Sequence, residues 1–411
     1  MELIANTKIS SRGFELGSTG FIVTKENALK LGFKHDKNID RYIREYRNGK
    51  DLTNKPRGVL CIDPWDLNEN DLINRFPEIY QWLSIHVKPN RLTNKDTHLK
   101  KYWWKHRRSR EELRQLLTDV DRYIATVETS KHRFFQFLDK SILPDNMLVN
   151  IALDDAFYFG VLSSRIHITW ALAQGSVLGP TPRYNKIRCF ETFPFPETTE
   201  EQNPRIRALG EQLDVHRKRQ QKQHPDLTMT GMYNVLSKLR SGETLTTKEK
   251  TIHEQGLVSV LMQLHNELDA AVAQAYGWPA NLSESEILTN LVNLNTARAA
   301  EETQGHIRWL RPDFQSPKPE TQATLHIPNN NPKKSTKKTN TSTKKPIWPK
   351  ALPDQVRELR TALASAQNPV TPEELARTFT RARTDRVADL LETLATLNQA
   401  RKLNDGRYLV G

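Results

Sequence analysis

The chain has 411 residues, enough for two or three domains, and its 37% hydrophobic and 27% charged residues are typical of a globular protein. Its 61 Lys and Arg against 48 Asp and Glu give a formal net charge of +13. This charge favours phosphate backbones or acidic surfaces as partners; the alternative is that the charged side chains only solvate the surface. The two cysteines and the lack of a signal peptide or a membrane-length apolar run predict a cytoplasmic protein with no disulfide scaffold, cysteine-based zinc site or membrane segment.

The first 196 residues combine strand and helix patterns. Short apolar runs over 58–62 and 122–127 predict strands. Residues 70–87 and 155–172 predict helices, because apolar side chains of the second segment recur at steps of three and four. We therefore expect a mixed α/β domain over residues 1–196.

The following residues predict a helical domain and then a linker. Residues 197–312 carry only helix patterns, the clearest over 203–223 and 256–279, and are expected to pack on another part of the protein. Residues 313–348 predict a disordered, lysine-rich linker, since six lysines fall between 333 and 345 and few side chains there could be buried.

The last segment, residues 349–411, predicts three helices and a hairpin. Thr371 and Glu374 form a capping box at the start of the second helix, and an Asp-Gly turn joins two short apolar runs at the end. This is the order of a winged helix, which binds DNA in some proteins and only protein in others. The whole chain is therefore expected to be α+β, with a mixed α/β domain, a helical spacer, a linker and a small winged-helix-like unit.

A search for catalytic motifs returns only weak candidates. Asp63-Pro64-Trp65 follows an apolar run, as in the loop that holds the target amine in amino-methyltransferases, but the second proline of that loop is missing. Pro144-Asp145 resembles half of a nuclease motif and lacks the other half. Phosphate loops and HExxH motifs are absent, and His253 and His265 are interpreted as helix-surface or core residues. We predict no catalytic, cofactor-binding or metal-binding residue.

Four stretches within the first 190 residues place cations beside aromatic side chains. Such stretches suit phosphate contacts next to base-edge contacts, although each one alone is better explained by a solvated charge beside a core aromatic. Their number favours nucleic-acid binding. They are "RYIREYRNGKDL" (41–52), "YWWKHRRSREELR" (102–114), "TSKHRFFQF" (129–137) and "PRYNKIR" (182–188).

Several of these blocks, together with "FYFGVLSSRIHITWALAQGSVLGPTPRYNKIRCFETFPFP", resemble the carboxy-terminal half of large class I, adenine-specific DNA methyltransferases of the type IIG-like restriction and phage-defence kind. The resemblance extends over residues 8 to 411. It implies a DNA target recognition domain followed by a helical tail. The family's S-adenosylmethionine turn and its NPP[YF] loop belong to the other half, so we expect S-adenosylmethionine in a catalytic partner and no cofactor in this chain.

The resemblance carries over a set of candidate DNA contacts in a basic turn, in an "SSR" block and in an "RYN" block, to which the cations of the 129–137 stretch are added. Whether the "SSR" block contacts DNA or packs on the catalytic domain stays open. The candidates are Arg44, Arg47, Asn48, Lys50, Lys131, Arg133, Arg165, Arg183, Tyr184, Asn185, Lys186 and Arg188.

The sequence thus predicts the recognition part of a site-specific adenine-N6 DNA methyltransferase, with double-stranded DNA and a separate catalytic subunit or domain as partners. Alone, this chain is expected to be catalytically inactive. Two alternatives remain: a stand-alone DNA-binding regulator that uses residues 349–411 as its main reader, and a truncated methyltransferase remnant without function.

Overall fold

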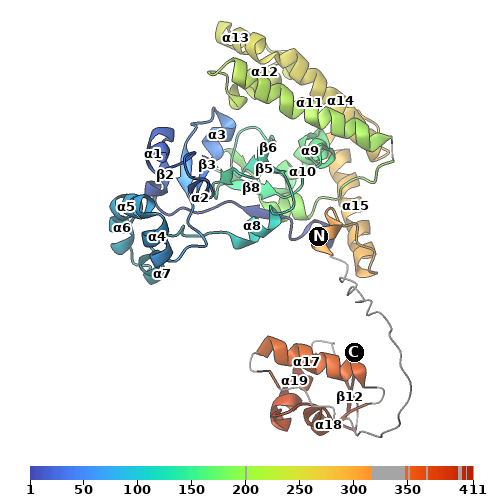
Figure 1. Cartoon of the computed structure of the whole chain (residues 1–411). Helices are drawn as coiled ribbons and strands as arrows, with labels where there is room; N and C mark the ends of the chain where they lie inside the picture. Colours follow the sequence, from blue (N-terminus) through green and yellow to red (C-terminus); the bar gives the residue numbers. More distant parts are fainter. Residues whose placement is uncertain are drawn as a thin grey trace, which may run out of the picture. The chain divides into compact units, whose positions relative to one another are not determined.

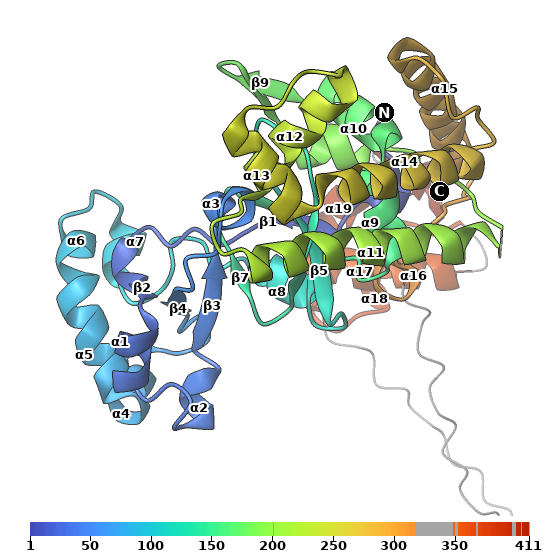
Figure 2. The same ribbon diagram turned by 90° about the horizontal axis from the view of Figure 1, so that it is seen from above.

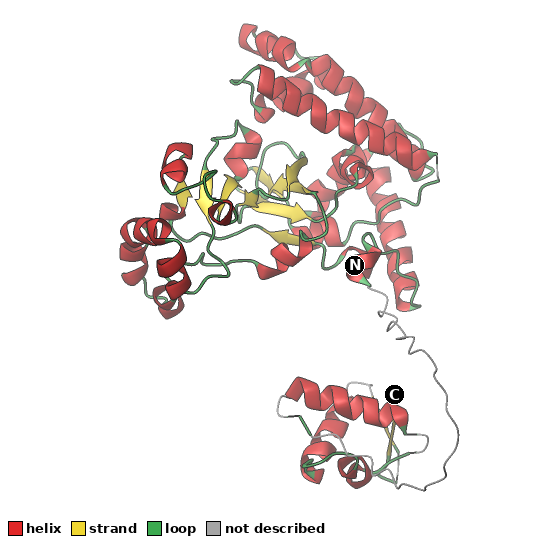
Figure 3. Ribbon diagram, viewed as in Figure 1, coloured by secondary structure: helices red, strands yellow, loops and turns green. Residues whose placement is uncertain are grey.

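The computed structural model describes residues 1–199, 201–316, 348–349, 352–366, 369–396, 400–403 and 405–410. The chain divides into two compact units, Met1–Thr321 and Gln322–Gly411. Most of the predicted linker, 313–348, lies outside the described residues. Helices and strands alternate in the first unit, and the expected α+β organisation is confirmed (Figure 3).

An antiparallel four-stranded sheet lies at the centre of the first unit (Figure 1). Its longest strand is β5, which coincides with the predicted strand 122–127 and is buried at five of its six positions because both of its faces are covered. Two neighbours flank β5, so the backbone hydrogen bonds of its two edges are satisfied within the sheet. The order is β1 (Ser10–Arg12), β8 (Leu148–Ile151), β5 (Arg122–Val127) and β6 (Gln136–Asp139).

A second four-stranded sheet is joined to the first through one short strand. The strand β7 lies between β6 and β8 in the sequence but pairs in parallel with β3 of the second sheet. The predicted strand 58–62 forms the middle of this sheet as β4. The order is β2 (Ile22–Val23), β4 (Leu60–Ile62), β3 (Ile43–Arg47) and β7 (Leu143–Pro144).

Short helices surround the second sheet. The single helix predicted over 70–87 is two helices, because Pro77 begins the second one and Phe76 takes a non-helical conformation before it. These helices are α1 (Lys25–Lys30), α2 (Lys37–Asp40), α3 (Gly49–Thr53), α4 (Glu69–Arg75), α5 (Pro77–His86), α6 (Lys88–Leu92), α7 (Thr97–Lys101) and α8 (Glu111–Leu116), with the 3-10 turns η1 (Ile4–Asn6) and η2 (Thr19–Phe21).

The helix predicted over 155–172 is also broken, and the prediction of one long helix is wrong. It divides into α9 (Ala156–Ser163) and α10 (Arg165–Gln174), with Ser164 extended between them at ψ 158°. The backbone N–H of Arg165 donates to the Asp269 carboxylate at 2.6 Å, so a distant side chain caps α10. Periodicity alone could not reveal this tertiary cap.

The helical part of the first unit shares one hydrophobic core with the sheets. The predicted helix 203–223 is present as α11, and Leu257 separates α13 from α14 in a left-handed conformation at φ 43°. The helices are α11 (Gln202–Gln223), α12 (Met229–Ser241), α13 (Thr247–Gly256), α14 (Val258–Ala275), α15 (Glu284–Thr303) and α16 (Pro312–Gln315). None of the described helices is long and apolar enough to cross a membrane.

The helix α11 lies against β6, the edge strand of the central sheet, and passes beside α9 (Figure 2). Asp214 accepts a hydrogen bond from the N–H of Phe137 at 3.3 Å, and Lys218 donates to the carbonyl of the same residue at 2.6 Å. Arg217, only 1% exposed, donates to the Phe135 carbonyl at 2.7 Å. Side chains of α11 thus satisfy backbone groups that an edge strand otherwise presents to solvent.

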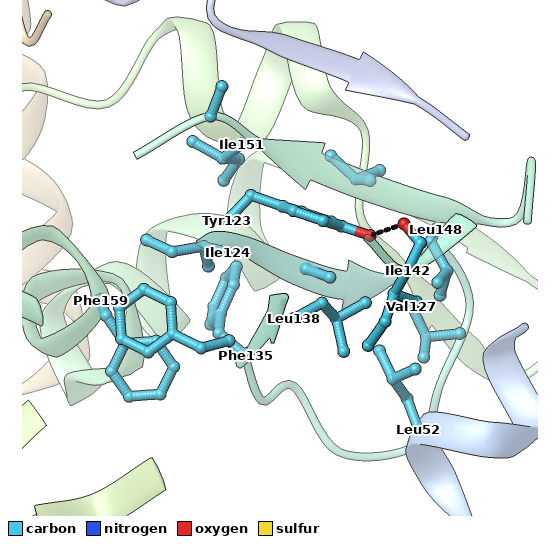
Figure 4. Packing of buried hydrophobic residues seen from close by; sticks show 14 of the residues in the cluster. Leu52, Tyr123, Ile124, Val127, Phe135, Leu138, Ile142, Leu148, Ile151 and Phe159 are labelled. Carbon is cyan, nitrogen blue, oxygen red and sulfur yellow. Dashed lines mark hydrogen bonds between the residues drawn. The ribbon is translucent and has the colours of Figure 1, made fainter. Parts of the chain in front are cut away.

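Figure 4 shows the core between the central sheet and the helices. The aliphatic side chains of β5 and β8 pack there together with Phe159 of α9. The Tyr123 hydroxyl donates to the Ile142 carbonyl at 3.1 Å, so this buried polar atom has its partner.

The described residues of the second unit form three helices and a two-stranded hairpin, in the predicted order. The Thr371–Glu374 capping box is confirmed. Leu359 and Leu391, both 0% exposed, belong to a core separate from that of the first unit. The elements are α17 (Leu352–Ser365), α18 (Pro372–Arg377), α19 (Thr384–Thr396), β11 (Ala400–Lys402) and β12 (Tyr408–Val410).

Close approach of α9 and α11 leads to a stability prediction for Gly210. A Cβ atom added there would lie 2.5 Å from the Ala156 carbonyl oxygen, which is backbone and can move little. We expect Gly210→Ala to lower the free energy of unfolding by about 1–3 kcal/mol, although alanine favours helix formation over glycine. Urea denaturation measures the change. Ala208→Leu, on the exposed side of the same helix, should leave stability nearly unaltered.

Candidate DNA interface

The carboxylate of Glu128 holds two arginines from separate strands. Glu128 directly follows β5, and its side chain is 6% exposed. Arg183 Nε and Nη2 lie 2.8 and 2.7 Å from Oε1, and Arg12 forms an ion pair with Oε2. The two arginine side chains are 39% and 41% exposed. One buried negative charge therefore faces two partly exposed positive charges, which leaves a net positive charge toward solvent.

Backbone hydrogen bonds attach a small hairpin to the same place. The hairpin consists of β9 (Ser176–Leu178) and β10 (Thr181–Arg183). The Tyr184 N–H donates to the Glu128 carbonyl at 2.6 Å, and the Ser130 N–H donates to the Pro182 carbonyl at 3.3 Å. Arg183 is thus positioned by the main chain as well as by Glu128.

Arg133 supports this arrangement from inside. It is 7% exposed and donates to the carbonyls of Val127 and Glu128, the second at 3.4 Å. Burial lowers the pKa of Arg133 to about 10, so the guanidinium remains charged at neutral pH. The sequence predicts Arg133 as a DNA contact, but the structure places it in the interior, where it holds the backbone around Glu128.

Two lysines lie beside the end of β5. Lys50 is the second residue of α3, which packs on the strand so closely that a Cβ at Gly49 would be 3.0 Å from Val127 Cγ1. Lys131 is exposed and its Nζ donates to Asn234 Oδ1 at 2.7 Å. We call the group at this end of β5 the basic cluster; it comprises Arg12, Lys50, Glu128, Lys131 and Arg183.

The chain after β10 continues the positive charge. Asn185 caps the π-helical turn η3 (Lys186–Glu191) by accepting the N–H groups of Ile187 and Arg188. Lys186 Nζ is 2.5 Å from Glu191 Oε1, whereas Arg188 is exposed and forms no ion pair with a described residue. Arg188 is therefore free to contact an anionic partner.

Three predicted contacts in the 41–52 stretch lie away from the basic cluster or have structural roles. Arg44 donates to the carbonyls of Lys140 and Ser141, near the opposite end of β5. Arg47 forms an ion pair with Glu45. Asn48 caps α3 with its side chain, so the expected basic turn leads directly into a helix.

Two further predicted contacts are turned inward or half-buried. Tyr184 is 1% exposed, and its hydroxyl lies 3.0 Å from His167 Nε2. Burial lowers the pKa of His167 to about 3, so this pair is uncharged at neutral pH. Arg165 is half-buried at the start of α10. In this conformation Tyr184 contributes to packing and is not available to a ligand.

The Asp63-Pro64-Trp65 loop has no free carboxylate. Asp63 is 1% exposed, and Arg114 Nη1 and Nη2 donate to its two oxygens at 2.8 and 2.7 Å. Burial alone would raise the pKa of Asp63, but the nearby charges of His106 and Arg114 and the Arg114 hydrogen bonds together lower it. These residues therefore do not fit an S-adenosylmethionine-dependent site, because the carboxylate that would hold a substrate amine is already bound.

Cys61 and His106 complete a group that resembles a nucleophilic triad. Cys61 Sγ lies 3.7 Å from His106 Nε2, and His106 Nδ1 lies 3.5 Å from Asp63. All three side chains are buried, and burial raises the pKa of the Cys61 thiol and lowers that of His106. The thiol is thus protonated and inaccessible, and the group is part of the core. Among the described residues no cluster of three metal-ligating side chains occurs.

Comparison with known proteins identifies the part of the chain that holds the basic cluster. Residues 8–197 match the family model of the MmeI target recognition domain. These residues are therefore similar to the target recognition domain of that family. The assignment includes every residue of the basic cluster and the hairpin.

Two further proteins are similar over longer or overlapping parts. The structure of the Type IIL restriction-modification enzyme MmeI in complex with DNA matches with a TM-score of 0.55 and 18% identity, over 73% of this chain and 37% of that one. DNA methyltransferase A of Bacillus subtilis (strain 168) is 28% identical over 150 residues, which are 36% of this chain and 14% of the relative. The chain thus spans well under half the length of either protein.

The sequence patterns missed two members of the basic cluster. Arg12 and Glu128 stand in stretches without an aromatic-cationic pattern, and only the pairing of β1, β5 and β10 with their neighbours brings them together. A sequence signal was available only for their partner Arg183: no acidic residue occurs between Asp155 and Glu191, a span that holds four cations.

The Asp63–Arg114 pair leads to a testable prediction. Asp63→Asn leaves a buried arginine without its carboxylate and is expected to lower the free energy of unfolding by about 3–5 kcal/mol, measured in urea. Asp66→Asn removes an exposed ion pair with Arg41 and should cost at most about 1 kcal/mol.

The same pair predicts a pH dependence. Since the folded-state pKa of Asp63 is lowered, its stabilisation is present above the unfolded value of about 3.9 and is lost as the pH falls through the folded value. Asp63→Asn should therefore flatten the acid limb of the stability curve; an unaltered limb would contradict this role.

Proposed function

We propose that this chain is the DNA sequence-recognition part of a site-specific, adenine-N6 DNA methyltransferase of a restriction-modification or phage-defence system. The observation that carries the proposal is the match of residues 8–197 to the family model of the MmeI target recognition domain. The likeness to an enzyme whose structure was solved in complex with DNA supports it. The formal net charge of +13 is consistent with a polyanionic partner.

The basic cluster is the proposed contact surface. Arg183 and Arg12 present guanidinium groups that Glu128 holds in a fixed orientation, and a fixed guanidinium can donate two hydrogen bonds to a guanine edge or to a phosphate. Lys50, Lys131 and Arg188 are exposed and suit phosphate contacts, which position a protein on DNA without reading its sequence.

Methyl transfer is proposed to take place on a catalytic partner that binds S-adenosylmethionine. The buried, ion-paired state of Asp63 supports this division, because the nearest candidate for an amine-binding loop in this chain is occupied. The purified chain should transfer no tritiated methyl group from S-adenosylmethionine to mixed duplex DNA. Transfer by this chain alone would overturn the proposed division.

The second unit offers an alternative DNA reader. Arg381 and Arg386 are exposed before and within α19, whereas Arg383 is paired with Asp385. Because each unit has its own core, residues 349–411 can be deleted without opening the first unit. A recognition subunit should keep most of its site-specific binding after this deletion, while a winged-helix regulator should lose it.

Salt dependence tests the proposed phosphate contacts directly. The logarithm of the affinity for duplex DNA should fall linearly with the logarithm of salt concentration, with a slope that counts phosphate contacts. Arg188→Ala should reduce this slope by about 1 if Arg188 contacts a phosphate. Lys30→Ala, which removes an exposed ion pair with Glu26 on α1, is the matched control and should leave the slope unchanged.

A further inference from the structure

A cavity of about 480 Å³ opens on one face of the second sheet. Ile43 and Glu45 of β3 stand on the same face as Leu60 of β4, because Glu45 lies opposite Leu60 and successive side chains of a strand alternate between the two faces. The helices that line the cavity, α1 and α2, have only six and four residues, so they leave part of this face uncovered. Cavities of about 300–1,000 Å³ are the usual size of small-molecule sites.

The wall of this cavity consists mostly of hydrocarbon. Phe33 and Val59 are half-buried, and Leu29 is 44% exposed although it is a large aliphatic residue. Ser141 is the one neutral polar side chain of the lining, and its hydroxyl already donates to Asp139 Oδ1 at 2.5 Å. Water in contact with such a wall is unfavourable, so an apolar ligand that displaces this water gains free energy.

Positive charge remains available at the rim. Lys25 and Lys34 line the cavity, and neither forms an ion pair with a described residue. The two acids of the lining are already engaged: Asp40 accepts the backbone N–H of Lys34 at 2.6 Å, and Glu45 forms an ion pair with Arg47. The lining therefore offers two free ammonium groups and no free carboxylate.

The backbone holds both amines against the wall. Lys25 Nζ lies 3.9 Å from the position of a Cβ at Gly58, which is itself part of the lining. Lys34 has φ 67°, a left-handed conformation that is unfavourable for a residue with a side chain and that its hydrogen bond to Asp40 maintains. Lys34 Nζ lies 5.9 Å from the centre of the Phe33 ring. Charge and hydrocarbon thus meet at one place.

This combination selects one class of ligand. A nucleobase carries several hydrogen-bonding groups, and burying them without partners is costly. The described lining has no free neutral polar side chain to satisfy them. A hydrocarbon body with a single anionic group matches both the wall and the two amines.

We propose that this cavity binds a carboxylate with a hydrocarbon body, of the class of medium-chain fatty acids. The body lies against Leu29, Phe33 and Val59, and the carboxylate is held by the amines of Lys25 and Lys34. The cavity shares no residue with the basic cluster. This inference goes beyond the proposed DNA recognition, and its test needs no DNA.

The test measures binding of decanoate to the full chain by isothermal titration calorimetry, below the concentration at which decanoate forms micelles. Decanol, which has the same body without the charge, is the second probe. Lys25→Ala with Lys34→Ala should weaken decanoate binding about tenfold and leave decanol binding unchanged, since only the two charges are lost. The matched control, Lys222→Ala with Lys250→Ala, removes two exposed lysines of α11 and α13 and should bind both probes like wild type.

A second variant fills the cavity. Leu29→Trp places a larger side chain on its wall and should abolish binding of decanoate and of decanol alike. Ile85→Trp, at an exposed position of α5, is its control and should bind both probes. Thermal unfolding of the two tryptophan variants should match wild type, because both positions are on the surface.

Four results would overturn the proposal. Decanoate that does not bind wild type leaves the cavity without this class of ligand. Unchanged decanoate affinity in the double lysine variant removes the two amines from the site, and unchanged affinity in Leu29→Trp places the ligand elsewhere. Binding of adenosine monophosphate, lost in Leu29→Trp, in place of decanoate would assign the cavity to a nucleotide. None of these results bears on the proposed DNA recognition, which the salt dependence of DNA binding tests by itself.

Discussion

The contact between α11 and the edge strand β6 is the interaction on which the first unit depends. Asp214, Arg217 and Lys218 supply hydrogen-bond partners to the backbone of Phe135 and Phe137 at this edge. Because buried backbone groups without partners are costly, the sheet and the helices are stable together rather than apart. This is the physical reason why one hydrophobic core includes both the sheets and the helices that follow residue 197. The helical part thus supports residues 8–197 structurally.

The basic cluster lies near this contact, at the end of β5 that leads to Glu128. Arg133 holds the backbone around Glu128, and Glu128 in turn holds Arg12 and Arg183. A guanidinium whose orientation is set before binding loses less conformational entropy when it meets its ligand. The arrangement therefore separates two roles. Buried charged side chains position their neighbours, and exposed charged side chains contact the ligand. Residue type alone does not distinguish these roles, since Arg133 and Arg183 stand in similar basic-aromatic stretches.

The same distinction explains why the chain holds groups that resemble catalytic sites without the corresponding chemistry. Cys61, Asp63 and His106 have the residue types of a nucleophilic site, yet burial keeps the thiol protonated and Arg114 occupies the carboxylate. These three buried residues contribute to the stability of the fold. The surface of the first unit instead carries cationic and apolar side chains, which suit a binding surface better than a catalytic site.

The sequence by itself determined the α+β composition, the strands β4 and β5, the long helix α11, the Thr371–Glu374 capping box and the resemblance to target recognition domains, because these depend on local periodicity, local hydrogen bonds and residue identity. Only the tertiary structure decided the break at Ser164, the interior positions of Arg133 and Tyr184, and the pairing of Arg12 and Arg183 with Glu128. Each of these depends on a partner more than 50 residues away or on burial by distant elements, and neither is encoded in the spacing of nearby side chains.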